Sequence, residues 1–337
     1  YIFLYLHYIC IFRIILLSGK KGVRRMDNLI LSFNVVAPLC FVMALGYFLK
    51  YLKMFDENTV NVMNNVAFKA FLPCLLFYNI YTTNLGDVIN PKLMIFACFS
   101  IISLFFVLIL IIPIFEKDNS KRGVMIQGIF RSNFVLFGIP VATSLAGEGN
   151  IGVTALLIGI VVPTFNVLSV ICLEIFRGGK VNIKKVAHGI ITNPLIIGSF
   201  LGLSMITIGI KLPTFIEATI KDVSKIATPL SLILLGASFS FSNVKKYLKE
   251  TIIAAVGKLV LVPLVFLAIS YAFGFRDISL LSLMIMFAAP TAVSSFQMAK
   301  QMDGDGDLAG QIVVFTSAFS IVTVFGWIFL LKQFSLI

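Results

Sequence analysis

The stretch Phe130–Pro140 reads FRSNFVLFGIP, and the stretch Phe287–Gln297 reads FAAPTAVSSFQ. Each places polar residues and a proline inside a long apolar run, where a proline removes a helix hydrogen bond and opens the backbone. Asn133 and Thr291 lie near the midpoints of the two runs, 158 residues apart. The pattern predicts two interrupted helices that cross in the middle of an apolar layer and leave backbone groups free. The alternative is that these residues only permit close packing or a kink.

Prolines also recur at regular distances along the chain. Two pairs are separated by 156 residues, Pro38 with Pro194 and Pro73 with Pro229. Two further pairs are separated by 150 residues, Pro113 with Pro263 and Pro140 with Pro290. This regularity indicates an internal repeat. We expect helix breaks at Pro73, Pro140, Pro229 and Pro290, because these prolines interrupt apolar runs at matching places in the two halves.

The composition is that of a protein embedded in lipid. Of 337 residues, 59% are hydrophobic and 12% are charged, and the mean hydropathy is +1.03. Soluble domains carry about 25% charged residues. Ten apolar runs are long enough to cross a hydrocarbon core of about 30 Å; they lie near residues 29–49, 60–81, 92–115, 123–145, 150–175, 187–210, 217–242, 251–273, 279–301 and 308–331.

Five helices in each half is an odd number, so the second half enters the membrane with the opposite orientation. The predicted fold is therefore an all-α membrane protein with about ten transmembrane helices in two inverted five-helix repeats. The repeats span residues 26–176 and 187–337, and a short basic linker at 177–186 joins them. Helices four and nine are the broken, crossing pair.

Lysine and arginine residues collect in the loops after odd-numbered helices, which hold thirteen of them against five in the even-numbered loops. Basic loops stay in the cytoplasm, so we expect a multi-pass protein of the cell membrane with both termini outside. We interpret these lysines as solvent-exposed residues that set the orientation of the helices in the membrane. Binding of nucleic acid or phosphate is the less favoured interpretation, and we expect no nucleic-acid partner.

Residues 1–25 conflict with this charge pattern, because the basic cluster at 20–25 would lie at the outer end of the first helix. The cluster can be encoded by a purine-rich run that resembles a bacterial ribosome-binding site. We therefore interpret residues 1–25 as an upstream extension that is not native, with Met26 as the true start. A signal or anchor segment is the alternative, although no small-residue cleavage site follows the apolar residues 1–18.

The chain lacks the motifs of an enzyme or a metal site. The five cysteines are scattered singly in apolar runs, as small core residues are. The run Asp303–Asp307 begins like a calcium loop, but Leu308 stands where glycine is needed and Val314 where glutamate is needed. There is no HExxH, nucleophile elbow or phosphate-binding glycine loop. We expect no enzymatic activity, metal or cofactor.

Basic residues lie deep in the predicted spans, whereas the central part of every span lacks Asp and Glu. An ion in lipid costs at least several kcal/mol, so each side chain either extends to the surface or meets a carboxylate ligand. Arg131 is assigned to the substrate, because a guanidinium binds a carboxylate in bidentate fashion beside Asn133. Lys69 is given a structural role, and Lys258 and Lys300 are expected to reach the surface. The missing acids leave the coupling ion, H+ or Na+, open.

Four segments together resemble the auxin efflux carrier family, especially its bacterial members, over about residues 29–333: Asn64–Pro73, Arg131–Pro140, Thr192–Pro194 and Ala289–Gln311. The resemblance implies a scaffold set and a transport set of helices, a substrate site where helices four and nine cross, and alternating access of the elevator type. It matches Asn133 and Pro290 to the crossover. The predicted substrate site comprises Leu72, Arg131, Ser132, Asn133, Pro290, Thr291 and Ser294.

The predicted function is secondary transport of small organic anions. Ser132 stands where plant exporters have a proline and Thr291 where they have an amide, which disfavours auxin itself. Bacterial relatives are associated with dicarboxylates such as malate or malonate. A carrier like the bile-acid sodium symporters, a channel and a receptor that does not transport remain alternatives. A homodimer accords with the resemblance.

Overall fold

The computed structural model describes Phe33 and residues 37–82, 90–147, 151–177 and 183–337. The proposed extension at 1–25 and much of the basic linker lie outside these ranges. Within them the chain is helical, and its extended pairing is a single isolated bridge. The prediction of an all-helical protein is confirmed.

The helices follow one another in this order: Ala37–Tyr51, α2 (Glu57–Val66), η1 (Ala67–Phe71), α3 (Leu72–Tyr81), α4 (Pro91–Phe115), α5 (Asn119–Phe130), α6 (Phe134–Ala146), α7 (Ile151–Phe176), α8 (Ile183–Ile191), α9 (Pro194–Ile208), α10 (Thr214–Ser238), α11 (Ser242–Lys246), α12 (Leu248–Val256), η3 (Gly257–Leu261), α13 (Val262–Ala272), α14 (Asp277–Ala288), α15 (Ser294–Gln301) and α16 (Gly306–Gln333). The π-helical segments η1 and η3 each lie inside a longer helix. Among the described residues, five helices are long and apolar enough to cross a membrane: Glu57–Tyr81, Pro91–Phe115, Gly152–Phe176, Leu248–Ala272 and Gly306–Gln333.

Helices of the second half repeat the lengths of those in the first. Three pairs of helices begin and end 157 residues apart: Ala37–Tyr51 with Pro194–Ile208, Glu57–Tyr81 with Thr214–Ser238, and Pro91–Phe115 with Leu248–Ala272. A fourth pair, Asn119–Phe130 with Asp277–Ala288, begins and ends 158 residues apart. The spacing of the prolines in the sequence therefore has a counterpart in the lengths of the helices.

Acidic and amide side chains define where several helices begin. Asp56, Asn90 and Asp305 accept hydrogen bonds from backbone amides in the first turns of α2, α4 and α16. Each satisfies an N–H group that has no partner inside its own helix. Before α5, the hydroxyl and amide of Ser120 donate to Asp118 and hold the pKa of its carboxyl below the usual range. The helix boundaries thus follow from local side-chain chemistry.

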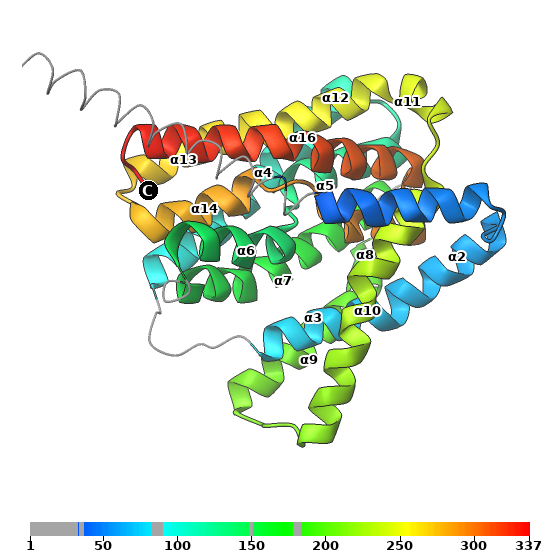
Figure 1. Ribbon diagram of the computed structural model, residues 1–337, viewed down its shortest axis with the longest axis horizontal. Helices are drawn as coiled ribbons and strands as arrows, with labels where there is room; N and C mark the ends of the chain where they lie inside the picture. Colours follow the sequence, from blue (N-terminus) through cyan, green and yellow to red (C-terminus); the bar gives the residue numbers. More distant parts are fainter. Residues whose placement is uncertain (1–32, 34–36, 83–89, 148–150, 178–182) are drawn as a thin grey trace, which may run out of the picture.

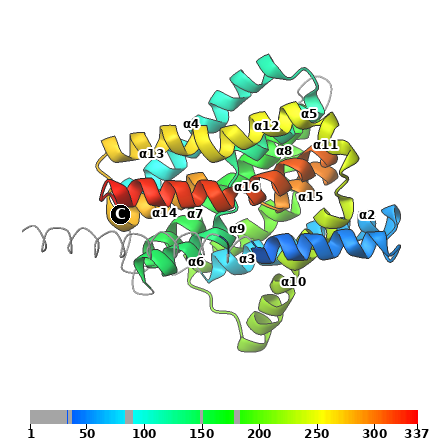
Figure 2. The same ribbon diagram turned by 45° about the horizontal axis from the view of Figure 1, so that its top comes forward.

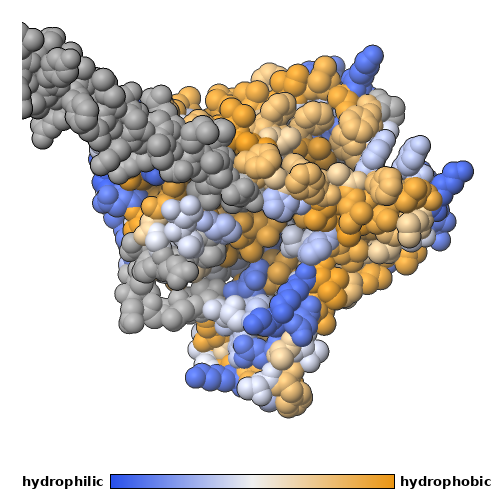
Figure 3. Space-filling view, viewed as in Figure 1, coloured by the Kyte–Doolittle hydropathy of each residue, from blue (hydrophilic) through white to orange (hydrophobic). Residues whose placement is uncertain are grey.

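Most of the described connections between helices lie at two opposite ends of the molecule, at the left and right of Figure 1. One end contains the loops near residues 116–121, 174–177, 240–250 and 302–307. Ion pairs join Lys121 to Glu250 (2.7 Å) and Arg177 to Asp303 (2.7 Å). Hydrogen bonds join Asp305 N to Ser120 O (3.2 Å) and Asn243 to Asp307 (3.1 Å). The other end joins Lys92 to Phe273 O (2.8 Å) and Asp277 N to Leu336 O (3.0 Å). The connection between α9 and α10 lies apart from both, at the bottom of Figure 1, where Leu212 N donates to the Tyr81 hydroxyl (2.8 Å). Between the two ends the surface is largely apolar (Figure 3). On α4, for example, Phe99, Leu110 and Ile114 are exposed, as in a helix that faces lipid.

The helices pack as two groups (Figure 2). The first group comprises α2, η1, α3, α9 and α10, with Ala37–Tyr51 packed on α10 through Gly46 and Gly236. The second group comprises α4 to α7 and α12 to α16, with η3. Within the first group, α3 packs against both α9 and α10, and within the second, α7 packs against α4, α5 and α6. The interface between the two groups is therefore a place where a binding site can lie.

The predicted helix breaks at Pro140 and Pro229 are wrong, because α6 and α10 continue through these residues. A proline removes one backbone hydrogen bond, and the neighbouring bonds are enough to hold the helix. Pro73 follows the π segment η1 by two residues, as Pro263 follows η3. The wider π turn gives the proline ring room beside the preceding turn. Pro290 lies in a true gap, between α14 and α15.

Candidate functional site

Two interruptions meet in the interior of the second group. The gap between α5 and α6 spans residues 131–133, and the gap between α14 and α15 spans 289–293. Ser132 and Thr291 form an isolated antiparallel bridge, and the amide of Asn133 donates to the carbonyl of Pro290 at 2.8 Å. The two extended segments therefore lie side by side and cross.

Side chains satisfy the backbone groups that the gaps release. The Thr291 hydroxyl donates to the carbonyl of Gly128 at 2.6 Å, and the Thr291 amide donates to the Thr316 hydroxyl at 3.3 Å. The hydroxyl of Ser132 donates to the carbonyl of Ala289 at 3.3 Å. All of these groups are buried, where an unpaired backbone group is costly. Thr291 therefore holds the crossing together.

Replacing Thr291 by valine keeps the side-chain volume and removes the hydroxyl that donates to Gly128 O. The buried carbonyl then loses its partner, so we expect the free energy of unfolding to fall by about 1–3 kcal/mol. Thermal unfolding of the purified protein in detergent measures this change. Thr323→Val is the matched control, because the hydroxyl of Thr323 is exposed and bonds within its own helix. Equal shifts in Tm for the two variants would contradict the role given to Thr291.

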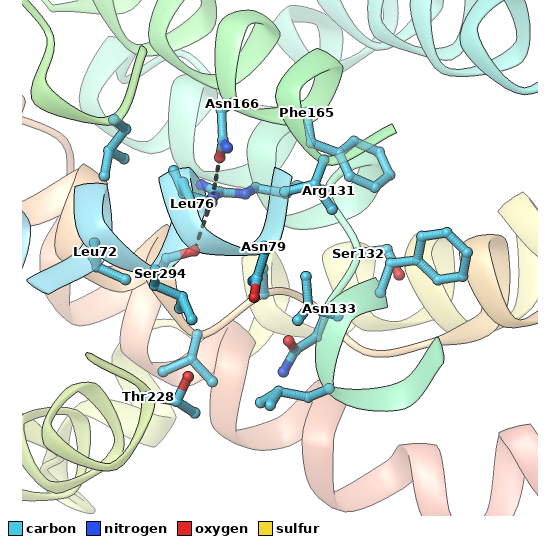
Figure 4. A pocket seen from close by; sticks show the side chains of 18 of the residues that line it. Leu72, Leu76, Asn79, Arg131, Ser132, Asn133, Phe165, Asn166, Thr228 and Ser294 are labelled. Atoms are coloured by element: carbon cyan, nitrogen blue, oxygen red, sulfur yellow. Dashed lines mark hydrogen bonds between the residues drawn. The ribbon is translucent and has the colours of Figure 1, made fainter. Parts of the chain in front are cut away.

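An open cavity lies beside the crossing and between the two helix groups; the empty space in it, counted together with the solvent at its mouth, is about 650 Å³. Its wall includes Leu72 and Asn79 from α3, Arg131 to Asn133 from the first gap, Asn166 from α7, Thr228 and Ser231 from α10, and Ser294 from α15 (Figure 4). Five of the predicted substrate residues thus share one cavity: Leu72, Arg131, Ser132, Asn133 and Ser294. Pro290 and Thr291 lie behind its wall, because their backbone and hydroxyl groups face the crossing.

Arg131 is buried at the cavity, with 4% of its surface exposed. Its Nη2 donates to Asn166 Oδ1 at 2.7 Å and to Ser294 Oγ at 2.8 Å (Figure 4), and its Nη1 donates to the sulfur of Met298. These partners are all neutral. In the described part of the chain no carboxylate pairs with this guanidinium. The site therefore holds an uncompensated positive charge.

Two amide groups beside Arg131 also lack partners. The Nδ2 atoms of Asn133 and Asn166 are buried, and neither has a hydrogen-bond acceptor among the residues that the structure describes. Buried donors of this kind are normally satisfied by protein, water or ligand. These two amides and the guanidinium belong to residues that line the cavity. N–H donors of this kind suit a ligand that carries several acceptors and negative charge.

The sequence did not single out Asn166, although an asparagine three residues after Pro163 in an otherwise apolar helix is a recognisable signal. Lys69 is exposed and does not line the cavity. The expectation that Lys258 reaches the surface is wrong. Its side chain is fully buried in the protein, and the residue lies near the middle of the helix Leu248–Ala272.

Comparison with known proteins agrees with this architecture. Residues 31–328 match the family described as membrane transport protein. An uncharacterized transporter of Methanocaldococcus jannaschii is 23% identical over 312 residues, which are 89% of this chain and 99% of the relative. A protein of Rhizobium meliloti that is provisionally named a malonate transporter is 22% identical over 307 residues, 89% of this chain and 96% of the relative.

The names of these relatives point to a transporter and not to an enzyme. The family match covers nearly the whole described chain, and the apolar helices are those of a multi-pass membrane protein. The resemblance seen in the sequence is thereby confirmed. This chain belongs to the membrane transport protein family, the family of the auxin efflux carriers.

Proposed function

We propose that the protein carries small organic anions, of the dicarboxylate class that includes malonate and malate, across the cytoplasmic membrane. The observation that carries this proposal is the buried guanidinium of Arg131, which has only neutral partners. A bound carboxylate would supply the missing negative charge and accept from the unpartnered amides of Asn133 and Asn166. The name of the Rhizobium meliloti relative supports the same substrate class.

A second carboxylate has a place on the opposite wall of the cavity. Thr228 and Ser231 line that wall from α10, and the buried hydroxyl of Ser231 has no partner among the described residues. A dicarboxylate bound in this way would touch Arg131 in the second helix group and hydroxyls in the first. Because a monocarboxylate leaves the second set of donors unsatisfied, it should bind more weakly.

A ten-helix inverted repeat would permit a mechanism of the elevator type. Gly46 packs against the backbone carbonyl of Ile233, and Gly202 packs against that of Phe77. The two glycines are 156 residues apart in the sequence, and so are their two partners, Phe77 and Ile233. Each repeat therefore places its first helix on the second helix of the other repeat, as in an inverted pair. The second helix group would then move as a unit past the first and carry the cavity with it.

The orientation follows from the charge pattern. The end that contains Lys121, Arg177 and Lys246 would face the cytoplasm, with both termini outside. H+ or Na+ would serve as the coupling ion.

Counterflow in proteoliposomes tests the proposal. Vesicles are loaded with unlabelled malonate, malate, succinate, lactate or indole acetate, and entry of the labelled counterpart is followed with and without sodium. We expect saturable exchange of the dicarboxylates. Conductance without saturation would identify a channel, and the absence of any exchange by folded protein would remove the proposed substrate class. A strict sodium requirement would favour the alternative of a carrier like the bile-acid sodium symporters.

Pro290→Ala is expected to slow exchange several-fold while leaving the Kd for malonate nearly unchanged. Alanine restores an N–H group and lets α14 extend, which disturbs the bond between Asn133 N and Pro290 O without touching the cavity wall. Exchange rates at saturating substrate measure the effect. Pro229→Ala is the control, since Pro229 lies in a continuous helix. Equal exchange rates in the two variants would mean that Pro290 only bends the chain.

A further inference from the structure

We propose that Lys258 is a buried proton-binding site, and that its protonation accompanies the movement of a dianion. The Lys258 side chain is fully buried, and its Nζ has no hydrogen-bond partner within the described ranges. The transport part of the proposal depends on the function proposed above, whereas binding of the proton does not. Lys258 does not line the cavity beside Arg131, so it forms a second site.

The position of Lys258 excludes contact with either surface. It belongs to the π segment η3 and lies ten residues after Leu248 and fourteen before Ala272 in one continuous helix. At 1.5 Å per residue these separations are about 15 Å and about 21 Å. A lysine side chain is too short to cover either distance. π segments inside α-helices occur frequently at functional sites.

The elements around η3 offer the amine no counter-charge. The segment packs against α5, α14 and α16, with Ile129 next to Gly257 and the indole nitrogen of Trp327 donating to Leu259 O at 2.9 Å. α5, α14, α16 and the helix that contains Lys258 carry their other charged and titratable residues at or near their ends. These residues are Lys121, Arg122, Lys249, Glu250, Tyr271, Asp277, Asp307 and Lys332, with Arg131 just beyond α5. Glu250, the acid on the same helix, is paired with Lys121.

An amine without water or a partner is more stable neutral than charged. Burial therefore favours the neutral amine of Lys258 in this conformation. This amine can accept one proton to become an ammonium ion without any other reactant. Both Lys258 and Arg131 belong to the second helix group. A dianion at Arg131 brings two negative charges against one fixed positive charge, and an ammonium at Lys258 supplies the second. The loaded group would carry one dianion with one proton.

The single tryptophan of the chain gives a direct test. Trp327 bonds to the carbonyl next to Lys258, so a charge that forms on Lys258 should shift the indole emission. We expect the fluorescence of the purified full chain to titrate between about pH 5 and pH 10. The transition should vanish in Lys258→Met, which keeps the side chain long and neutral, and persist in Lys300→Met. A flat profile in the unmodified protein, or the same transition in Lys258→Met, would overturn the proton site.

Transport tests the coupling. With one proton per dianion, a gradient of one pH unit at zero membrane potential should drive about tenfold accumulation of malonate. Lys258→Met should still exchange malonate at equal pH but lose the response to the gradient. If the unmodified protein exchanges malonate without responding to the gradient, the coupling is wrong. If no anion is exchanged while the fluorescence still titrates, the proposed substrate fails and the proton site stands.

Discussion

Arg131→Gln is expected to cause the largest loss of substrate binding of any single change in the cavity. Glutamine is neutral and shorter, so the variant removes the uncompensated charge together with the bonds of Nη2 to Asn166 and Ser294. A charge-assisted hydrogen bond contributes about 1.5–3 kcal/mol, so the Kd for malonate should rise by about 10-fold to 150-fold. Binding of labelled malonate and lactate to the purified variant measures the loss for a dianion and for a monoanion.

The loss should be larger for malonate than for lactate, because the dianion depends more on the fixed positive charge. Arg131→Lys should recover part of the binding, since it restores the charge without the bidentate geometry. Lys300→Gln is the control for a basic residue outside the cavity wall. Equal losses for malonate and lactate, with no recovery by lysine, would indicate that Arg131 only holds Asn166 and Met298 in place.

Gly46→Ala is expected to cause a large loss of stability. A Cβ atom at Gly46 would lie 2.0 Å from the carbonyl oxygen of Ile233, so the helix Ala37–Tyr51 and α10 would have to separate. Overpacking usually costs about 1–3 kcal/mol, and we expect the upper end because backbone meets backbone. Thermal unfolding in detergent should show the lower Tm. Gly202→Ala should have a smaller effect, because its Cβ would lie 2.8 Å from Phe77 O.

Gly326→Ala provides the control for these glycines. Gly326 lies inside α16, and a Cβ atom there would have no neighbour within 4 Å. Alanine has the higher helix propensity, by up to about 1 kcal/mol, so this variant should be as stable as the unmodified protein or more so. A Tm for Gly46→Ala equal to that of Gly326→Ala would show that the two helices can separate without loss.

The sequence by itself determined the class of the protein and the place of the crossing. Long apolar runs require helices, because a backbone in lipid must satisfy its own hydrogen bonds. The polar stretch after Phe130 and the proline at Pro290 interrupt two of these runs, and the structure has gaps at both places. These are local effects of residue type and backbone chemistry, which explains why a single sequence was enough to locate them.

Only the tertiary structure decided which side chains face the cavity. Thr291 looked like a substrate residue, but its hydroxyl bonds to Gly128 O on the far side of the crossing. Asn166 reaches the cavity because α7 packs beside the first gap, and Lys258 is buried because α5, α14 and α16 enclose η3. The direction of each side chain depends on contacts between residues far apart in the chain. A broken helix can be read from its own residues, but the face that it turns to a ligand depends on its neighbours.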